Sequence, residues 1–175
     1  FTNTQYDGTK GGLVLTNPTS NQTGTYDFPD TLDLGGVFSV VLKRHFRGEG
    51  FYTSDLFDNR TELIDTWTDF DGAEATAVNA ELLVAVTTAA PSGSSYTDSD
   101  FASKTFNTFA NGTYKGRGFK FKSTLSTSDP AQNIKISELG YTATLKRRTE
   151  QSNVLTANGS TNLTFTNTFF TGAAG

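Results

Sequence analysis

The stretch from Phe119 to Leu125, with the sequence FKFKSTL, decides the fold because apolar and polar residues alternate in it with a period of two. One face carries Phe119, Phe121, Ser123 and Leu125, and the other carries Lys120, Lys122 and Thr124. Successive side chains of a β-strand point to opposite faces of the sheet. The stretch therefore predicts a strand with one buried face.

The segment that follows predicts a partner for this strand. Asp129 and Pro130 are typical of a turn, and apolar residues then recur from Ile134 to Leu145. Their alternation slips phase near Ser137, which indicates a β-bulge because a bulge adds one unpaired residue to a strand. The two segments together predict an antiparallel hairpin with a long connection.

Further strand signals lie on both sides of this pair, each bounded by residues that favour turns. They are Gly12–Thr16 (GLVLT), Thr25–Phe28, Leu32–Gly36, Val37–His45 (VFSVVLKRH), Glu81–Thr88 (ELLVAVTT) and Leu163–Thr166. The first half of the run from Val37 to His45 is expected to be buried on both faces. No window favours a helix, since the best candidate, Ala73–Val84, has β-branched residues and an asparagine in its middle.

Many short strands without helices predict an all-β protein, and we expect an antiparallel β-sandwich that resembles a jelly roll, with no substantial helix. Residues 1–168 are expected to form a single β-sandwich domain, since 175 residues are enough for one core of ordinary size. Residues 169–175 end in a Gly-Ala tail that is typical of a linker to a following module. Because the chain opens at Phe1, we expect it to be a segment of a longer protein.

The composition excludes several kinds of chemistry. A chain with no cysteine has no thiol nucleophile and no thiolate metal site, and its one histidine does not make a His-rich site. The net charge of the chain is −4, whereas proteins that bind nucleic acids usually carry a basic surface. No apolar run reaches the 18 residues typical of a membrane span. We therefore expect no cofactor, no metal centre, no nucleic-acid partner and no insertion into a membrane.

The most suggestive local group is acidic and aromatic: Asp65, Trp67, Asp69 and Asp71. Carboxylate oxygens are the ligands that Ca²⁺ prefers, and an aromatic ring beside them offers a face for a sugar. These four residues are therefore candidates for a glycan or ion contact. The alternative, which the sequence favours, is that the carboxylates belong to turns and that Trp67 anchors a long loop to the core.

Two other places resemble catalytic groups. Asp98 and Asp100 are a carboxylate pair of the kind that glycosidases use, although turn chemistry explains them better. The chain has no serine in a nucleophile-elbow motif that could form a catalytic triad with His45. The favoured interpretation is that His45 lies at the solvated end of a strand. The sequence therefore predicts no catalytic residue, and we expect the protein not to be an enzyme.

Four basic residues lie in the stretch Phe119–Leu125 or just before it. Lys115, Arg117, Lys120 and Lys122 offer a contact for an anionic polysaccharide. The favoured alternative is that outward lysines protect a strand edge from unwanted pairing.

The stretch from Gly116 to Ser152, GRGFKFKSTLSTSDPAQNIKISELGYTATLKRRTEQS, resembles a recurrent segment of the host-specificity proteins at bacteriophage tail tips, the lambda J-like central tail fibres. The resemblance extends to four shorter pieces. These are LDLG (Leu32–Gly35), IDTWTDFDG (Ile64–Gly72), ELLVAVTTAAPSGSSYTD (Glu81–Asp98) and FFTG (Phe169–Gly172). The pieces follow the order of the family and cover most of the chain.

The resemblance implies a β-sandwich module within a virion tail, where it contributes to host recognition and receptor binding. Its implied partners are other tail-tip or fibre subunits, in a homotrimer, and a host-surface glycan or outer-membrane protein. The family pattern names no catalytic residue. A second possibility is a carbohydrate-binding module of a secreted enzyme.

Overall fold

The computed structural model describes residues 1–53, 63 and 76–145. The described elements are β1 (Thr4–Asp7), β2 (Gly12–Leu15), β3 (Thr23–Tyr52), β4 (Val78–Thr87), α1 (Asp98–Phe101), β5 (Asn107–Thr108), β6 (Gly112–Thr127) and β7 (Gln132–Leu145). The expected strand at Leu163–Thr166 and the tail at 169–175 lie outside the described residues.

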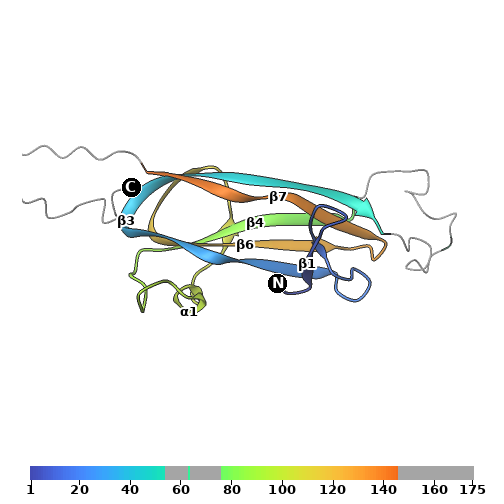
Figure 1. The fold of residues 1–175 in the computed structure, drawn as a ribbon, viewed down its shortest axis with the longest axis horizontal. Coiled ribbons are helices and arrows are strands. Elements are labelled where there is room, and N and C mark those ends of the chain that lie inside the picture. Colours follow the sequence, from blue (N-terminus) through green and yellow to red (C-terminus); the bar gives the residue numbers. More distant parts are fainter. Residues whose placement is uncertain (54–62, 64–75, 146–175) are drawn as a thin grey trace, which may run out of the picture.

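The protein is all-β and antiparallel, as predicted. Seven strands form a single hydrogen-bonded sheet in the order β1-β2-β7-β3-β6-β4-β5, in place of the two separate sheets expected of a sandwich. The sheet folds over because β3 curves back at one end (Figure 1). Residues 23–33 and 38–42 of β3 pair with β6, and residues 40–52 of β3 pair with β7.

The expected strands at Thr25–Phe28, Leu32–Gly36 and Val37–His45 are thus parts of one long strand, β3. Pro29 does not break it, because Pro29 lies in a register shift between Asp27 and Thr31, where β3 is out of step with β6. Proline lacks the N–H group that a regular ladder needs, and it is tolerated at such irregularities.

The fold-over of the sheet is built from glycines on two neighbouring strands. On β3 the turn contains Gly35, which has a φ of 73° and whose N–H donates to Asp33 Oδ1 at 2.7 Å. On β6 the corresponding corner lies between Gly118, which pairs with Asp33, and Gly116, which pairs with Phe38. A Cβ at Gly116 would overlap Val86. Because both strands bend together, β6 stays paired with β3 on each side of the corner.

The hairpin predicted from β6 and β7 is wrong. β3 lies between these two strands in the sheet, and β7 pairs with β2 and β3. The turn at Asp129 and Pro130 therefore carries the chain from one half of the folded sheet to the other. The bulge predicted near Ser137 is confirmed, since Arg47 faces Glu138 and Gly48 faces Ile136, which leaves Ser137 as the extra residue.

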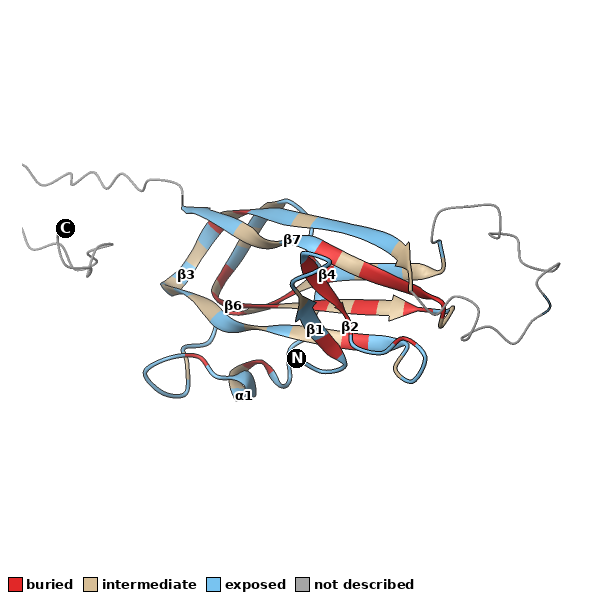
Figure 2. Cartoon of the chain, turned by 45° about the vertical axis from the view of Figure 1, so that its right-hand side comes forward, coloured by how far each residue is buried: buried red, intermediate tan, exposed pale blue. Residues whose placement is uncertain are grey.

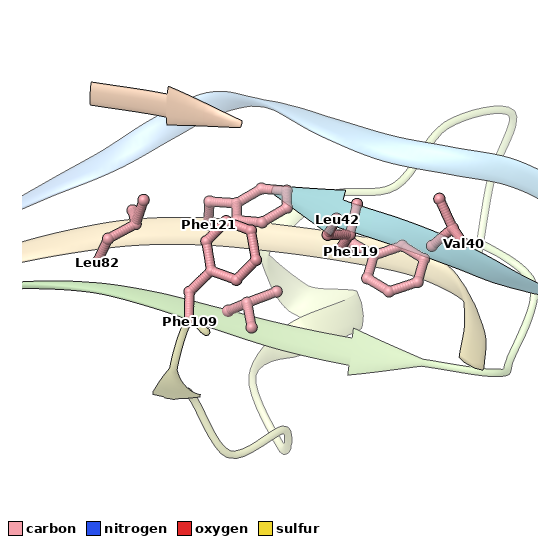
Figure 3. Close-up of a cluster of buried hydrophobic side chains, with 7 residues drawn as sticks. Val40, Leu42, Leu82, Phe109, Phe119 and Phe121 are labelled. Carbon is pink, nitrogen blue, oxygen red and sulfur yellow. The ribbon is translucent and has the colours of Figure 1, made fainter. Parts of the chain in front are cut away.

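The core lies between the two halves of the folded sheet. Its main cluster consists of Val40, Leu42, Leu82, Val84, Phe109, Phe119 and Phe121 (Figure 3). A second cluster consists of Leu13, Leu15, Leu125, Ile134 and Ile136. Figure 2 shows the buried residues concentrated on β2, β4, β6 and the beginning of β7.

The predicted burial of FKFKSTL on one face is confirmed, because Phe119, Phe121 and Leu125 are buried in these clusters. The expected burial of both faces at the start of the Val37–His45 run is wrong. Val40 points into the core, whereas Val37 is 42% exposed on the outer face.

Candidate functional site

The candidate glycan or ion contact at Asp65, Trp67, Asp69 and Asp71 lies outside the described residues. The other predicted positions, Asp98, Asp100 and His45, are described. Within the described part of the chain, no cluster of three or more histidine, aspartate or glutamate side chains has the geometry of a metal site.

Asp98 forms an ion pair with Lys120, on β6. The Lys120 side chain is only 6% exposed, whereas that of Asp98 is 86% exposed. Lys120 is buried because the α1 segment packs on the outer face of the sheet, where Ala85, Tyr96 and Phe101 form a small cluster. The pair therefore fastens this segment to β6, and it leaves Asp98 committed to a structural contact.

The unequal burial of the pair predicts an unequal response to mutation. We expect Asp98→Asn to destabilise the fold by about 1–2 kcal/mol, because it leaves a buried ammonium group without its charged partner. Lys120→Met should cost about 0.5 kcal/mol or less, since the remaining Asp98 is hydrated. Urea unfolding of the two variants measures the difference, and equal losses would contradict this account.

Asp100 accepts hydrogen bonds from two backbone N–H groups, one at the N-cap of α1 and one in the loop before it. Its carboxylate oxygens lie 2.8 Å from Thr97 N and 3.0 Å from Ser92 N. The bond from Thr97 N–H is the main cause that lowers the pKa of Asp100 from 3.8 to about 2, and the bond from Ser92 N–H adds to it. Asp98 and Asp100 thus have separate structural tasks: the turn chemistry favoured from the sequence is confirmed for Asp100, whereas Asp98 pairs with Lys120 on β6.

The lowered pKa of Asp100 predicts acid sensitivity of the α1 segment. Because the folded-state pKa lies below the ordinary value, the stabilisation by Asp100 is complete above about pH 4 and is lost as the pH falls toward 2. We expect a titration of the Asp100 carboxyl followed by NMR to have its midpoint near pH 2. The Thr97 amide signal should shift with the same midpoint in the wild-type protein and not in Asp100→Asn.

His45 lies on the outer face of β3 in a cross-strand contact with β7. Its Nε2 atom is 2.7 Å from Thr142 Oγ1, and its Nδ1 atom is 3.5 Å from Glu138 Oε1. The imidazole is half-exposed. His45 is therefore solvated, as expected, but the expected strand end is wrong, because His45 lies within β3 and pairs with Gly140 of β7.

Two further basic residues of β6 have partners within the chain. Arg117 Nε lies 3.2 Å from Asp33 Oδ1, and Lys122 Nζ lies 4.1 Å from the ring centroid of Phe106. The explanation that these lysines protect a strand edge is wrong, because β6 lies between β3 and β4 inside the sheet. Together with the Lys120 ion pair, these contacts fix the corner and the α1 segment.

A groove that the sequence did not predict lies between the β1–β2 hairpin, the first part of β3 and the bulge of β7. It has a volume of about 320 Å³ and is open to solvent. Six of its lining residues are Tyr6, Leu13, Tyr26, Phe28, Ser137 and Leu139. This volume is within the range of small-molecule sites, which run from about 300 to 1,000 Å³. We refer to it as the aromatic groove.

The aromatic wall of this groove continues into the core. The ring centroids of Phe1 and Tyr26 lie 4.7 Å apart, and those of Tyr26 and Phe28 lie 5.5 Å apart. Phe28 in turn lies 6.0 Å from Phe121, the centre of the main cluster. The core therefore holds the inner part of this wall in place.

Two close backbone approaches hold the β1–β2 hairpin beside the groove. A Cβ at Gly12 would lie 2.6 Å from the carbonyl oxygen of Ile136 on β7, and a Cβ at Gly24 would lie 2.8 Å from that of Asn3. Thr2 and Thr25 exchange two backbone hydrogen bonds of 2.8 Å, which join the start of the chain to β3. The residues of the groove come from three separate parts of the sequence. The phase slip near Ser137 was the one local feature of the sequence that marked part of the groove.

Comparisons with known proteins do not place the chain in a family. No protein-family model, no curated protein and no solved structure matches it. In the described ranges, none of the helices has the length and apolar character needed to cross a membrane.

Proposed function

We propose that this chain is a structural and adhesive module of a phage tail fibre or tail-tip host-specificity protein, and that it contributes to host-surface recognition and attachment. The observation that carries the adhesive part of the proposal is the aromatic groove, which opens to solvent on the antiparallel sheet. Exposed aromatic rings beside a few polar groups are typical of binding surfaces. The resemblance of Gly116–Ser152 to tail-tip proteins supports the virion tail as its location.

The arrangement of the resembling residues supports a scaffold role for them. The part of Gly116–Ser152 that the structure describes forms most of β6 and all of β7. The LDLG piece lies at the corner of β3, where Asp33 binds Gly35 N–H and Arg117. A recurrent segment with these tasks maintains the fold, while the groove and the loops are available for binding.

The partners that follow from this proposal are other subunits of the tail tip or fibre, in a homotrimer, and a glycan or outer-membrane protein of the host. The second candidate is a carbohydrate-binding module of a secreted enzyme. The same aromatic groove favours it, because the groove suits a sugar in either setting. The two functions differ in whether the chain is part of a virus particle.

Immunogold electron microscopy tests the proposal directly. Antibodies raised against the purified domain are applied to particles of the virus that encodes the chain, and gold is expected on the tail. Label at the distal tip supports receptor contact, and label along the fibre supports a spacer role in attachment. Intact particles that bind no antibody, while the purified domain does, would overturn the proposal.

A further inference from the structure

We propose that the aromatic groove binds an uncharged sugar ring of a surface polysaccharide, an inference that rests on the adhesive function proposed above and names its ligand class. The groove combines a small-molecule volume with exposed aromatic rings. The α1 segment and the outer face of β3 are used in the intramolecular contacts given above.

The first argument is the supply of aromatic faces. Tyr6 on β1 is 70% exposed, and Tyr26 on β3 is half-buried and also lines the groove. An aromatic ring provides a flat apolar face together with a polar tip. The C–H face of a sugar ring is apolar and its edge carries hydroxyl groups, so the two surfaces complement each other.

The second argument is the polar chemistry of the groove. The hydroxyl groups of Tyr6 and Tyr26 make no hydrogen bond to any other described residue, so both are available to a ligand. Ser137 projects from the bulge of β7 and adds a third hydroxyl, whose bond to the Arg47 carbonyl is long at 3.5 Å. Hydroxyl groups both donate and accept, as the hydroxyls of a sugar require.

The third argument is the absence of charge in the lining. None of the side chains that line the groove is acidic or basic. Lys135, whose side chain lies close to Gly12, forms an ion pair with Glu49. A site without charged groups does not compensate the desolvation of a carboxylate or a phosphate. The geometry therefore points to a neutral sugar and away from an acidic one.

The test uses an array of bacterial O-antigen polysaccharides, neutral oligosaccharides of glucose, galactose and N-acetylglucosamine, and sialylated and phosphorylated glycans. We expect binding of at least one neutral glycan. An NMR titration with the neutral glycan that binds should shift the amide signals of Leu13, Ser137 and Leu139. Binding of acidic glycans alone, binding of none, or shifts confined to other parts of the domain would overturn the inference.

Tyr6→Ala is the decisive variant because its side chain is exposed and its loss leaves the core intact. We expect a weakening of about tenfold or more, which is the scale of one aromatic contact. Tyr6→Phe keeps the ring and should weaken binding by about threefold or less. The matched control is Val37→Ala, which removes an exposed side chain at the corner of β3 and should bind as the wild type does. Unchanged affinity in Tyr6→Ala would refute the role of the groove.

The outcome separates this inference from the proposed function. Gold label on the virus tail without glycan binding at the groove would remove the ligand assignment and leave the tail module standing. Binding of a neutral glycan at the groove by a chain that is missing from the particle would do the reverse, and would favour the module of a secreted enzyme.

Discussion

Phe121→Ala should destabilise the fold by about 3–5 kcal/mol, which is the usual cost of removing a fully buried aromatic side chain. The Phe121 ring has no exposed surface, and it stacks on Tyr141 with 4.0 Å between the ring centroids. It also lies 5.3 Å from Phe109 and 6.0 Å from Phe28. Since Phe109 lies beside β5, Tyr141 on β7 and Phe28 on β3, the cavity left by the substitution would loosen both halves of the folded sheet.

Urea unfolding followed by circular dichroism measures this loss, which is a large part of the 5–15 kcal/mol typical of a whole domain. Tyr6→Ala serves as the control, because a 70% exposed aromatic side chain is expected to contribute about 0.5 kcal/mol or less to stability. A loss below about 2 kcal/mol in Phe121→Ala would contradict the central place of this ring in the core.

Asn133→Leu should cost about 2–4 kcal/mol, although leucine has a similar size and is more apolar. On β2, only Leu13 and Val14 are paired with β7 in the backbone ladder. The buried side-chain amide of Asn133 extends the contact between the two strands to Leu15. Its Oδ1 accepts from Leu15 N–H at 3.2 Å, and its Nδ2 donates to the Leu15 carbonyl at 3.0 Å. The substitution leaves both backbone groups buried without a partner.

The same urea experiment measures this loss, and amide hydrogen exchange locates it. Leu15 N–H should exchange much faster in Asn133→Leu than in the wild type, because its acceptor is removed. Asn107→Leu is the matched control on an exposed position, and it should change stability by about 0.5 kcal/mol or less. Unchanged protection of Leu15 N–H would show that Asn133 does not hold β2 in place.

The two results together also bear on the aromatic groove. Phe28 connects the groove to Phe121, and Asn133 holds β2 beside the bulge of β7. A site that is held in place before the ligand arrives loses less entropy on binding. We therefore expect both variants to bind the neutral glycan more weakly than Val37→Ala, even under conditions where they remain folded.

Several features of the fold were predictable from short stretches of sequence. The alternation in FKFKSTL correctly identified the buried face of β6, and the phase slip near Ser137 correctly identified the bulge of β7. The turn chemistry favoured for Asp100 agrees with the hydrogen bonds that its carboxylate accepts from Thr97 N–H and Ser92 N–H. These features depend on the pleat of one strand or on hydrogen bonds between near neighbours, so the local sequence contains their cause.

Other features depended on segments that are distant in the sequence. The alternation placed Lys120 on a solvent face, yet the α1 segment covers it. The order of residues suggested that β6 and β7 pair, yet β3 lies between them. The aromatic groove needs Tyr6, Tyr26 and Ser137 to meet from three separate strands.

The sequence by itself determined that this protein is antiparallel and all-β, which face of β6 carries the buried phenylalanines, and that β7 carries a bulge. Only the tertiary structure decided that a single sheet folds over at the glycine corners of β3 and β6, and that a neutral aromatic groove opens beside the bulge. The physical reason is that the side-chain period of a strand is a property of its own backbone. The choice of its partner depends instead on the chain entropy and packing of remote segments.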